Sequence, residues 1–373
     1  MAKNQALFIP CRSGLSAVSE GIIALHEIPD TMQIISGDIW NGETFEDGYV
    51  AVDDGHIVEC VFGRLHPNPT LKGCIMPGLV DCHTHIADAG LKLDRRYSLE
   101  ELVAPPDGLK HRYLRETDRS TLRKDMSTYA LRLRNNGVSQ FMDFREGGAD
   151  GARLLRSACP DAFILGRPVC DGFFEDEMDA LLEICNGIGI PSISDMDRGY
   201  IDKIADAVHR KNKMLALHAS ERVREDIDYI LSLEPDAVVH MVKATHSDIR
   251  KCADAGVSII TCPRSNAYFG SVPDLKYMVS SGADVCIGTD NAMLCPSADI
   301  MDDFRLFNDI LRGQGGDTGE SFKSLIKNGK KLLNLKSIIV GQTDKKADLL
   351  VFLTDAESLL RGDTPEVVRI SPS

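Results

Sequence analysis

The middle of the chain alternates short apolar runs with amphipathic stretches. One such stretch places Leu122, Met126, Tyr129 and Leu133 on a single helical face ahead of the apolar run at 138–144. Eight runs can be counted in this way, and eight βα units in series predict an α/β fold with a (β/α)₈ TIM barrel over residues 76–336. The first run ends at His85, and the others lie at 138–144, 162–166, 188–194, 214–218, 237–240, 257–262 and 285–290.

Strand-like patterns at both ends of the chain predict a smaller β domain. Residues 32–75 contain two β-rich runs around Asp54-Gly55, a strong hairpin signal. Residues 337–353 and 366–370 are again strand-like. We therefore expect a small β-sandwich domain built from both termini, residues 32–75 plus 337–373. Residues 1–31 make a poor signal peptide and are expected to form an N-terminal extension that stays on the mature protein.

Composition narrows the class of protein. The chain has 373 residues, of which 43% are apolar and 26% charged, as is usual for a globular protein. Its formal net charge of -14 disfavours nonspecific binding to nucleic acid polymers or anionic membranes, and no run approaches the roughly 20 apolar residues of a membrane span. Eleven scattered cysteines without a C-x-x-C motif indicate a reducing environment, so we expect a cytoplasmic protein.

Polar residues close several of the predicted strands. His83 and His85 stand at alternate positions and should share one face of the first strand. His218, His240 and Asp290 end later runs, and the carboxyl ends of barrel strands meet at one mouth. Three imidazoles and a carboxylate suit zinc with one position left for water. Taken singly, each histidine could instead be a hydrogen-bonded structural residue.

Five motifs, in order, carry a family resemblance: MPGLVDCHTH, LALHASE, AVVH, CPRSN and IGTDN. Together they resemble the amidohydrolase superfamily of metal-dependent hydrolases over roughly residues 32–356. The HASE motif is similar to the H-x-x-E element of adenosine, guanine and cytosine deaminases. The resemblance implies that Glu221 is a proton shuttle and that His240 contacts the attacking water. It also implies four metal ligands, namely His83, His85, His218 and Asp290.

General chemistry agrees with these roles. A divalent metal lowers the pKa of a bound water from 15.7 toward about 7. Asp290 can ligate the metal and accept a proton from that water, and His240 can help to hold or deprotonate it. Glu221 can protonate a ring nitrogen before an amine leaves, so Glu221, His240 and Asp290 are the catalytic candidates. Alternatively, Glu221 could be a first-turn helix carboxylate, favourable there through the helix dipole.

The number and kind of metal ions can also be addressed. Two-metal members of the superfamily often carry a bridging carbamylated lysine, and residues 163–176 and 186–200 contain no lysine. This absence favours one divalent metal ion. Zinc is the first expectation, and the ligand set also accepts iron. Asp195 and Asp197 leave a second, weak site open.

Three further residues are candidate substrate contacts. Arg145 follows a predicted strand, and Arg264 and Asn266 lie in the CPRSN motif. The arginines could bind a carboxylate, phosphate or carbonyl group of the substrate, or pair with structural carboxylates. Asn266 could instead be a turn residue.

The sequence thus predicts a metal-dependent aminohydrolase that deaminates a nucleobase, nucleoside or related N-heterocycle and releases ammonia. One alternative is a hydrolase of a cyclic amide, amidine or chloro-substituted ring that uses the same activated water. Another is a catalytically silent relative that serves as a scaffold. The expected partner is a small heterocyclic substrate, and the family resemblance suggests a homodimer.

Overall fold

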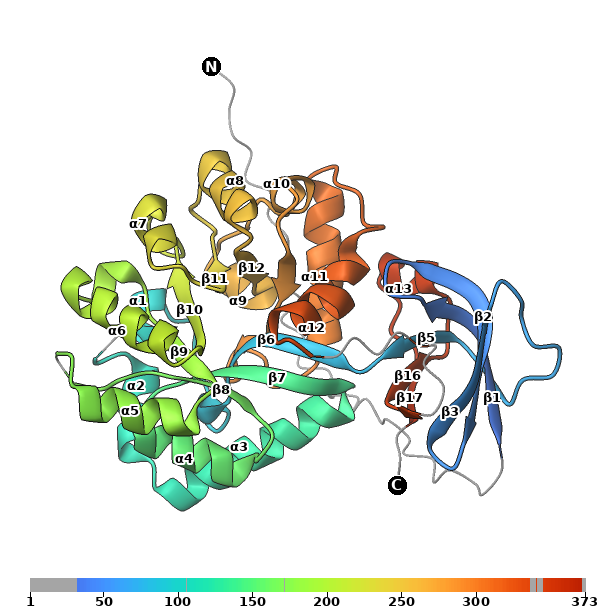
Figure 1. Ribbon diagram of the computed structural model, residues 1–373, viewed down its shortest axis with the longest axis horizontal. Helices are drawn as coiled ribbons and strands as arrows, with labels where there is room; N and C mark the ends of the chain where they lie inside the picture. Colours follow the sequence, from blue (N-terminus) through green and yellow to red (C-terminus); the bar gives the residue numbers. More distant parts are fainter. Residues whose placement is uncertain (1–31, 105, 171, 336–339, 341–344, 371–373) are drawn as a thin grey trace.

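The computed structural model describes residues 32–104, 106–170, 172–335, 340 and 345–370 (Figure 1). The structural statements below refer to these residues. The predicted N-terminal extension, residues 1–31, lies outside them, as does most of 337–344. Within the described residues, no helix is both long and apolar enough to cross a membrane.

A nine-stranded parallel sheet forms the larger part of the molecule, with strand order β13-β12-β11-β10-β9-β8-β7-β6-β14. All eight predicted apolar runs contain strands of this sheet. The predicted mixed α/β fold with a curled parallel sheet is confirmed. The strands are β6 (Leu79–His85), β7 (Val138–Arg145), β8 (Phe163–Gly166), β9 (Gly187–Ile190), β10 (Met214–Ala219), β11 (Ala237–His240), β12 (Ser258–Thr261), β13 (Val285–Ile287) and β14 (Asp290–Asn291).

The short strand β14 brings the end of the sheet back to its beginning. It pairs with β6, with Asp290 opposite Thr84, although it follows β13 almost directly in the chain. Between β13 and β14, the backbone at Gly288 presses against β6, and a Cβ there would lie 2.7 Å from the Cβ of His83. Glycine is the residue that allows this approach.

Helices connect successive strands and pack around the outside of the sheet (Figure 1). The predicted helical face of Leu122, Met126, Tyr129 and Leu133 is buried, which confirms the 3.6-residue reading of that stretch. The helices are α1 (Leu99–Val103), α2 (Leu109–Glu116), α3 (Arg119–Asn135), α4 (Gly148–Ala158), α5 (Glu175–Ile184), α6 (Arg198–Arg210), α7 (Ile227–Ser232), α8 (His246–Ala255), α9 (Pro263–Tyr268), α10 (Leu275–Ser280), α11 (Ile300–Gly313), α12 (Asn328–Leu332) and α13 (Ala356–Arg361).

Both faces of the parallel sheet are buried, and on β10 the alternation of side chains decides which way each one projects. On β10, Leu215 and Leu217 join the helices in the largest apolar cluster. Ala216 belongs to a second cluster on the opposite face, together with side chains of β6, β7 and β12. His218 has the parity of Ala216, so it projects to the face that the helices do not cover. This side of the curled sheet is where the candidate site lies.

A smaller sheet is built from strands near both ends of the chain, in the order β15-β3-β2-β1-β5-β16-β17, with β4 beside β1. The predicted hairpin at Asp54-Gly55 is confirmed, since β2 and β3 flank these two residues and both have positive φ. These strands form one eight-stranded sheet, and the predicted two-layer sandwich is not confirmed. The strands are β1 (Gln33–Trp40), β2 (Phe45–Asp53), β3 (His56–Phe62), β4 (Leu71–Lys72), β5 (Cys74–Pro77), β15 (Lys345–Lys346), β16 (Leu349–Phe352) and β17 (Val367–Ile370).

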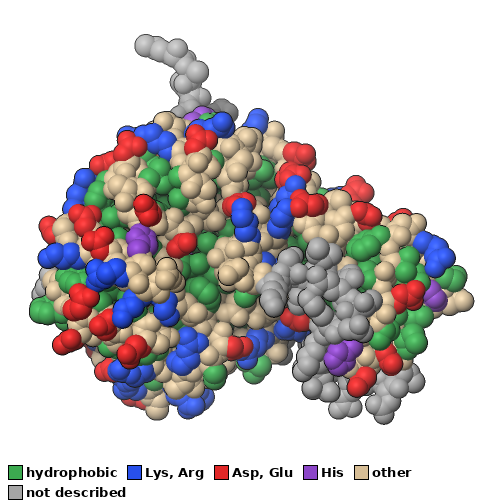
Figure 2. All heavy atoms as spheres, viewed as in Figure 1, with side chains coloured by type: hydrophobic (Ala, Val, Ile, Leu, Met, Phe, Trp, Pro, Cys, Tyr) green, Lys and Arg blue, Asp and Glu red, His purple; other side chains and the backbone are tan. Residues whose placement is uncertain are grey.

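The surface carries charges of both signs. On the face seen in Figure 2, acidic and basic side chains are interspersed over the larger lobe. Many exposed charged side chains of the protein are paired, for example Arg210 with Glu175 and Lys211 with Asp179. Exposed pairs of this kind contribute little to stability. The charged side chains that could form a functional site are the buried ones.

Candidate metal and active site

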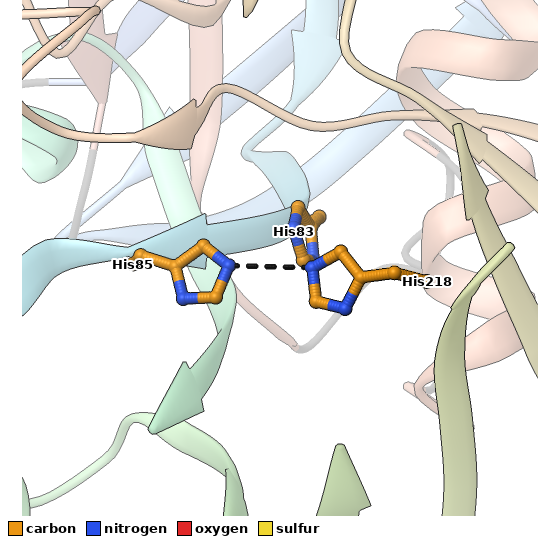
Figure 3. Close-up of side chains that lie close together, drawn as sticks. All are labelled: His83, His85 and His218. Carbon is orange, nitrogen blue, oxygen red and sulfur yellow. Dashed lines mark hydrogen bonds between the residues drawn. The ribbon is translucent and has the colours of Figure 1, made fainter. Parts of the chain in front are cut away.

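Three histidines from two strands converge on one point. His83 and His85 come from β6 and His218 from β10, and their rings point toward one another (Figure 3). Nε2 of His85 lies 3.4 Å from Nε2 of His218. The ring centroid of His83 is 4.9 Å from that of each of the other two. One nitrogen from each ring therefore falls within 4.8 Å of the others, which is close enough for one metal ion to contact all three.

Asp290 from β14 completes the cluster. Its Oδ1 lies 3.3 Å from Nε2 of His83 and 3.6 Å from Nε2 of His85. His83, His240 and Asp290 form a second group of potential ligands within 4.8 Å. The hydroxyl of Ser265 donates a hydrogen bond of 2.5 Å to Oδ2 of Asp290. The side chains that the sequence proposed as metal ligands therefore lie together in space.

The backbone at this cluster is unusual. Asp290 has a φ of 64° and His240 a φ of 75°, both in the left-handed region that residues other than glycine seldom adopt. Ser220, just after β10, has a φ of 49°. Such conformations cost free energy and persist where surrounding structure imposes them, which is common at functional sites. Here they fall at the ends of three strands whose side chains meet.

The donor atoms suit a divalent metal ion. Both ring nitrogens of His83 are buried without a hydrogen-bond partner among the described residues. Burial is the main reason that the pKa of His83 falls to about 3, and burial also lowers the pKa of His218. Burial alone would raise the pKa of Asp290, but His83 and the other imidazoles outweigh it and hold that pKa well below its usual range. Neutral imidazoles and a carboxylate are the forms that bind a metal.

Two of the rings are held by backbone carbonyls. Nδ1 of His85 lies 2.9 Å from the carbonyl oxygen of Phe144, and Nδ1 of His218 lies 3.1 Å from that of Ile190. A carbonyl only accepts, so each Nδ1 carries the proton and each Nε2 presents its lone pair to the centre.

Asp81, two positions before His83, has a different task. Its carboxylate accepts hydrogen bonds from the backbone NH and the hydroxyl of Thr289, at 3.0 and 2.6 Å. Thr289 immediately precedes Asp290, so Asp81 fastens the segment that carries this carboxylate. The alternating pattern on β6 thus supplies two potential ligands and one residue that anchors another strand.

Glu221 and His240 lie beside the cluster. Oε1 of Glu221 is 3.7 Å from Nε2 of His240, and Nδ2 of Asn266 is 3.1 Å from Nδ1 of His240. Burial raises the pKa of Glu221, an effect that His240 partly offsets. The alternative reading of Glu221 as a first-turn helix residue is wrong, because α7 begins only at Ile227 and its cap is Asp226.

A pocket opens over these side chains. Together with the open space at its mouth it measures about 760 Å³. The segment after β6 contributes Leu99, Val103, Ala104, Lys110 and His111 to its lining. The site residues that line the pocket are His85, His218, Glu221, His240 and Asp290.

The two arginines predicted to contact substrate are already paired. Arg264 binds Asp302 and Asp303, and the NH1 group of Arg145 lies 3.5 Å from Glu146. Neither lines the pocket. Asn266 contacts His240 rather than open space. Substrate contact by these three residues stays a prediction, and their present partners favour structural or positioning roles.

Sequence reasoning missed several charged residues at the pocket, among them Lys110, Glu146 and Arg167. Glu146 and Arg167 each directly follow a strand, β7 and β8, so the rule that located the histidines could have found them. Lys110 lies on α2, far from any strand end, and the sequence offered no signal for it. The Nε of Arg167 is buried without a hydrogen-bond partner among the described residues.

Known proteins resemble the chain in sequence and in fold. Residues 74–371 match the model of the Amidohydrolase family. A Methanocaldococcus jannaschii protein named Uncharacterized protein MJ0699 is 34% identical over 248 residues, which cover 60% of this chain and 64% of that protein. The 5-methylthioadenosine/S-adenosylhomocysteine deaminase of Bacillus cytotoxicus is 24% identical over 317 residues, covering 73% of this chain and 71% of that enzyme.

Solved structures agree on the fold. A zinc-bound adenosine deaminase from Xanthomonas campestris superposes with a TM-score of 0.70 at 17% identity, covering 90% of each chain. The zinc complex of atrazine chlorohydrolase TrzN from Arthrobacter aurescens gives a TM-score of 0.66 at 15% identity, covering 86% of each chain. The protein belongs to the amidohydrolase family. Its His/Asp cluster fits a divalent metal ion.

Proposed function

We propose that the protein is a metal-dependent aminohydrolase that deaminates a nucleobase, a nucleoside or a related N-heterocycle and releases ammonia. It is thus a hydrolase of C–N bonds other than peptide bonds. One observation carries the proposal: a metal-binding cluster and the carboxyl group of Glu221 line the same pocket. A metal cluster alone would suit many hydrolases. Glu221 adds a proton carrier outside the metal ligands, and this favours a reaction in which an amine leaves.

The proposed metal is a single zinc ion, held by His83, His85, His218 and Asp290. The mainly nitrogen donor set suits zinc, and two proteins of similar fold were crystallised with zinc. When bound, such an ion polarises a water molecule and lowers its pKa toward about 7. Iron is the alternative that metal analysis would distinguish.

The chain's own groups handle the protons. The carboxylate of Asp290 has the low pKa of a group that stays ionised, so it can accept a proton from the attacking water. His240, held at Nδ1 by Asn266, presents Nε2 toward the same space and can orient that water. Glu221 has a raised pKa, because of its burial, and can carry a proton to a ring nitrogen and later to the leaving amine.

The fold completes this proposal. We infer that the curled sheet closes as a (β/α)₈ barrel, since β14 pairs with β6 and Gly288 lies against the backbone of His83. In such barrels the pocket at the carboxyl ends of the strands holds the active site. The cluster, Glu221 and His240 all stand at those ends.

The experiment is an ammonia-release assay with zinc-loaded protein and a panel of amino-purines, amino-pyrimidines and their nucleosides. Ammonia release from at least one compound, absent with the Glu221→Gln protein, is the expected result. Chloride release from a chlorinated triazine, without ammonia release from any amino compound, would favour the alternative reaction. Protein that binds no zinc and turns over nothing would favour a scaffold.

A further inference from the structure

Lys110 is a buried lysine that lines the pocket. It lies on α2 with a side chain that is only 4% exposed. Its Nζ is 2.7 Å from Oε1 of Glu146, 3.0 Å from Oδ1 of Asn291 and 3.8 Å from Oδ2 of Asp88. A buried ammonium group is costly unless it is paired, and here it meets two carboxylates and an amide oxygen.

One arm of this arrangement leads to His85. The carboxylate oxygen of Glu146 that faces Lys110 is also 3.0 Å from Nδ1 of His85. This carboxylate oxygen lies beside the Nδ1 that already donates to the carbonyl oxygen of Phe144, and its negative charge favours the tautomer that leaves Nε2 of His85 open to a metal ion.

A second arm leads to Asp290. Asn291 receives the hydrogen bond of Lys110 at Oδ1 and donates from Nδ2 to Oδ1 of Asp290 at 3.0 Å. An ammonium group can only donate and a carboxylate can only accept, so the amide of Asn291 has one orientation that satisfies both. The bridge fixes the oxygen of Asp290 that faces the imidazoles of His83 and His85.

We propose that Lys110 is a positioning residue that holds His85 and Asp290 in the arrangement needed to bind metal. This inference rests on the metal site of the proposed function. Lys110 is not assigned a contact with substrate, because its ammonium group faces three protein acceptors. Because Lys110 lies on α2, its contacts also connect this helix, which lines the pocket together with α1, to His85 of β6 and Asp290 of β14.

The test measures zinc affinity of metal-free protein by competition with a chromophoric chelator, which needs no substrate. Lys110→Met should weaken zinc binding by about 10- to 100-fold, as is typical when a group that orients a ligand is lost. Lys330 is a second buried lysine, 7% exposed, on α12 and outside the pocket. Lys330→Met is the matched control and should bind zinc like the wild type.

Glu146→Gln and Asn291→Ala each interrupt one arm and should weaken zinc binding as well. Added to Lys110→Met, each should have a smaller effect than it has alone, because the arm is already broken. If Lys110→Met does not fold, these two variants carry the test, with thermal unfolding recorded with and without zinc.

The outcomes separate two failures. The positioning role would be overturned if Lys110→Met, or both arm variants, bound zinc with wild-type affinity and had a melting temperature lowered equally with and without zinc. The metal site would be left intact by that result. Failure of the wild-type protein to bind zinc would overturn the proposed function and this inference with it.

Discussion

Glu221 and His240 leave two adjacent strands of the curled sheet and meet again over the cluster, with Oε1 of Glu221 3.7 Å from Nε2 of His240. The two side chains face the same pocket but differ in what holds them. Asn266 fixes the ring of His240, whereas Glu221 has no comparably close partner among the contacts described above. A fixed imidazole beside a less restrained carboxyl suits one group that orients water and another that moves protons.

The Glu221→Gln protein should keep its metal and lose activity. Glutamine has nearly the same shape but cannot carry a proton, so turnover should fall by about 10²- to 10⁴-fold. Metal content and ammonia release, measured on the same preparation, check this. Deamination at the wild-type rate would show that another group shuttles the proton.

The Asp290→Ala protein should lose both metal and activity. Three imidazoles would remain, without the carboxylate that lies 3.3 Å from His83. The metal content of protein purified from zinc-supplemented cells checks the expectation. Ser265→Ala, which removes only the hydroxyl that binds Asp290, is the milder control and should retain most of the metal. Full metal content in Asp290→Ala would contradict the ligand assignment.

Asn266→Ala should lower turnover without removing the metal. The substitution frees Nδ1 of His240, and one hydrogen bond of about 1.4 kcal/mol corresponds to about tenfold in rate. Turnover number and metal content are the two measurements. An increase in KM alone would instead favour the direct substrate contact expected from the sequence.

Arg167→Met should raise KM more than it lowers kcat. The Nε of Arg167 is buried without a partner among the described residues and the side chain lines the pocket, so it is a donor available to a substrate oxygen. Loss of one such bond should raise KM by about tenfold or more. Arg264→Met is the comparison: its KM should not change, but its melting temperature should fall because Asp303 would be left buried and unpaired.

Metal removal should destabilise the folded protein. The site brings several buried polar groups together, and an ion that binds only the folded state adds RT ln(1 + [L]/Kd) to the free energy of unfolding. At a zinc concentration about 1,000 times Kd this amounts to about 4 kcal/mol. Chemical denaturation with zinc and with a chelator measures the difference. Equal stability in both conditions would argue against a metal site.

Strand positions could be predicted because the parallel strands are buried on both faces and therefore form nearly continuous apolar runs. The number of layers in the smaller β domain could not be predicted, because a strand pattern does not say how strands from the two ends of the chain will pair. β14, a two-residue strand, was merged into the run at 285–290, although it is the piece that returns to β6.

Some residues of the candidate site could be predicted from the sequence and others could not. His85 and His240 end their strands, His83 and His218 lie within two residues of a strand end, and Asp290 begins β14. Because the carboxyl ends of parallel strands meet on one side of a sheet, their positions in the sequence were enough to predict that they lie together. Lys110 reaches the same place from a helix, by the length of its side chain. Arg264 shows the reverse error: it lies next to Ser265, which binds Asp290, yet its own side chain turns to Asp303.

The pairing of β14 with β6 has a consequence for biosynthesis. His83 emerges from the ribosome more than two hundred residues before Asp290. A nascent or truncated chain that ends before β13 carries the imidazoles but cannot complete their coordination. A complete set of ligands therefore forms only once β14 has paired with β6, a contact between distant parts of the chain of the kind that forms slowly in folding.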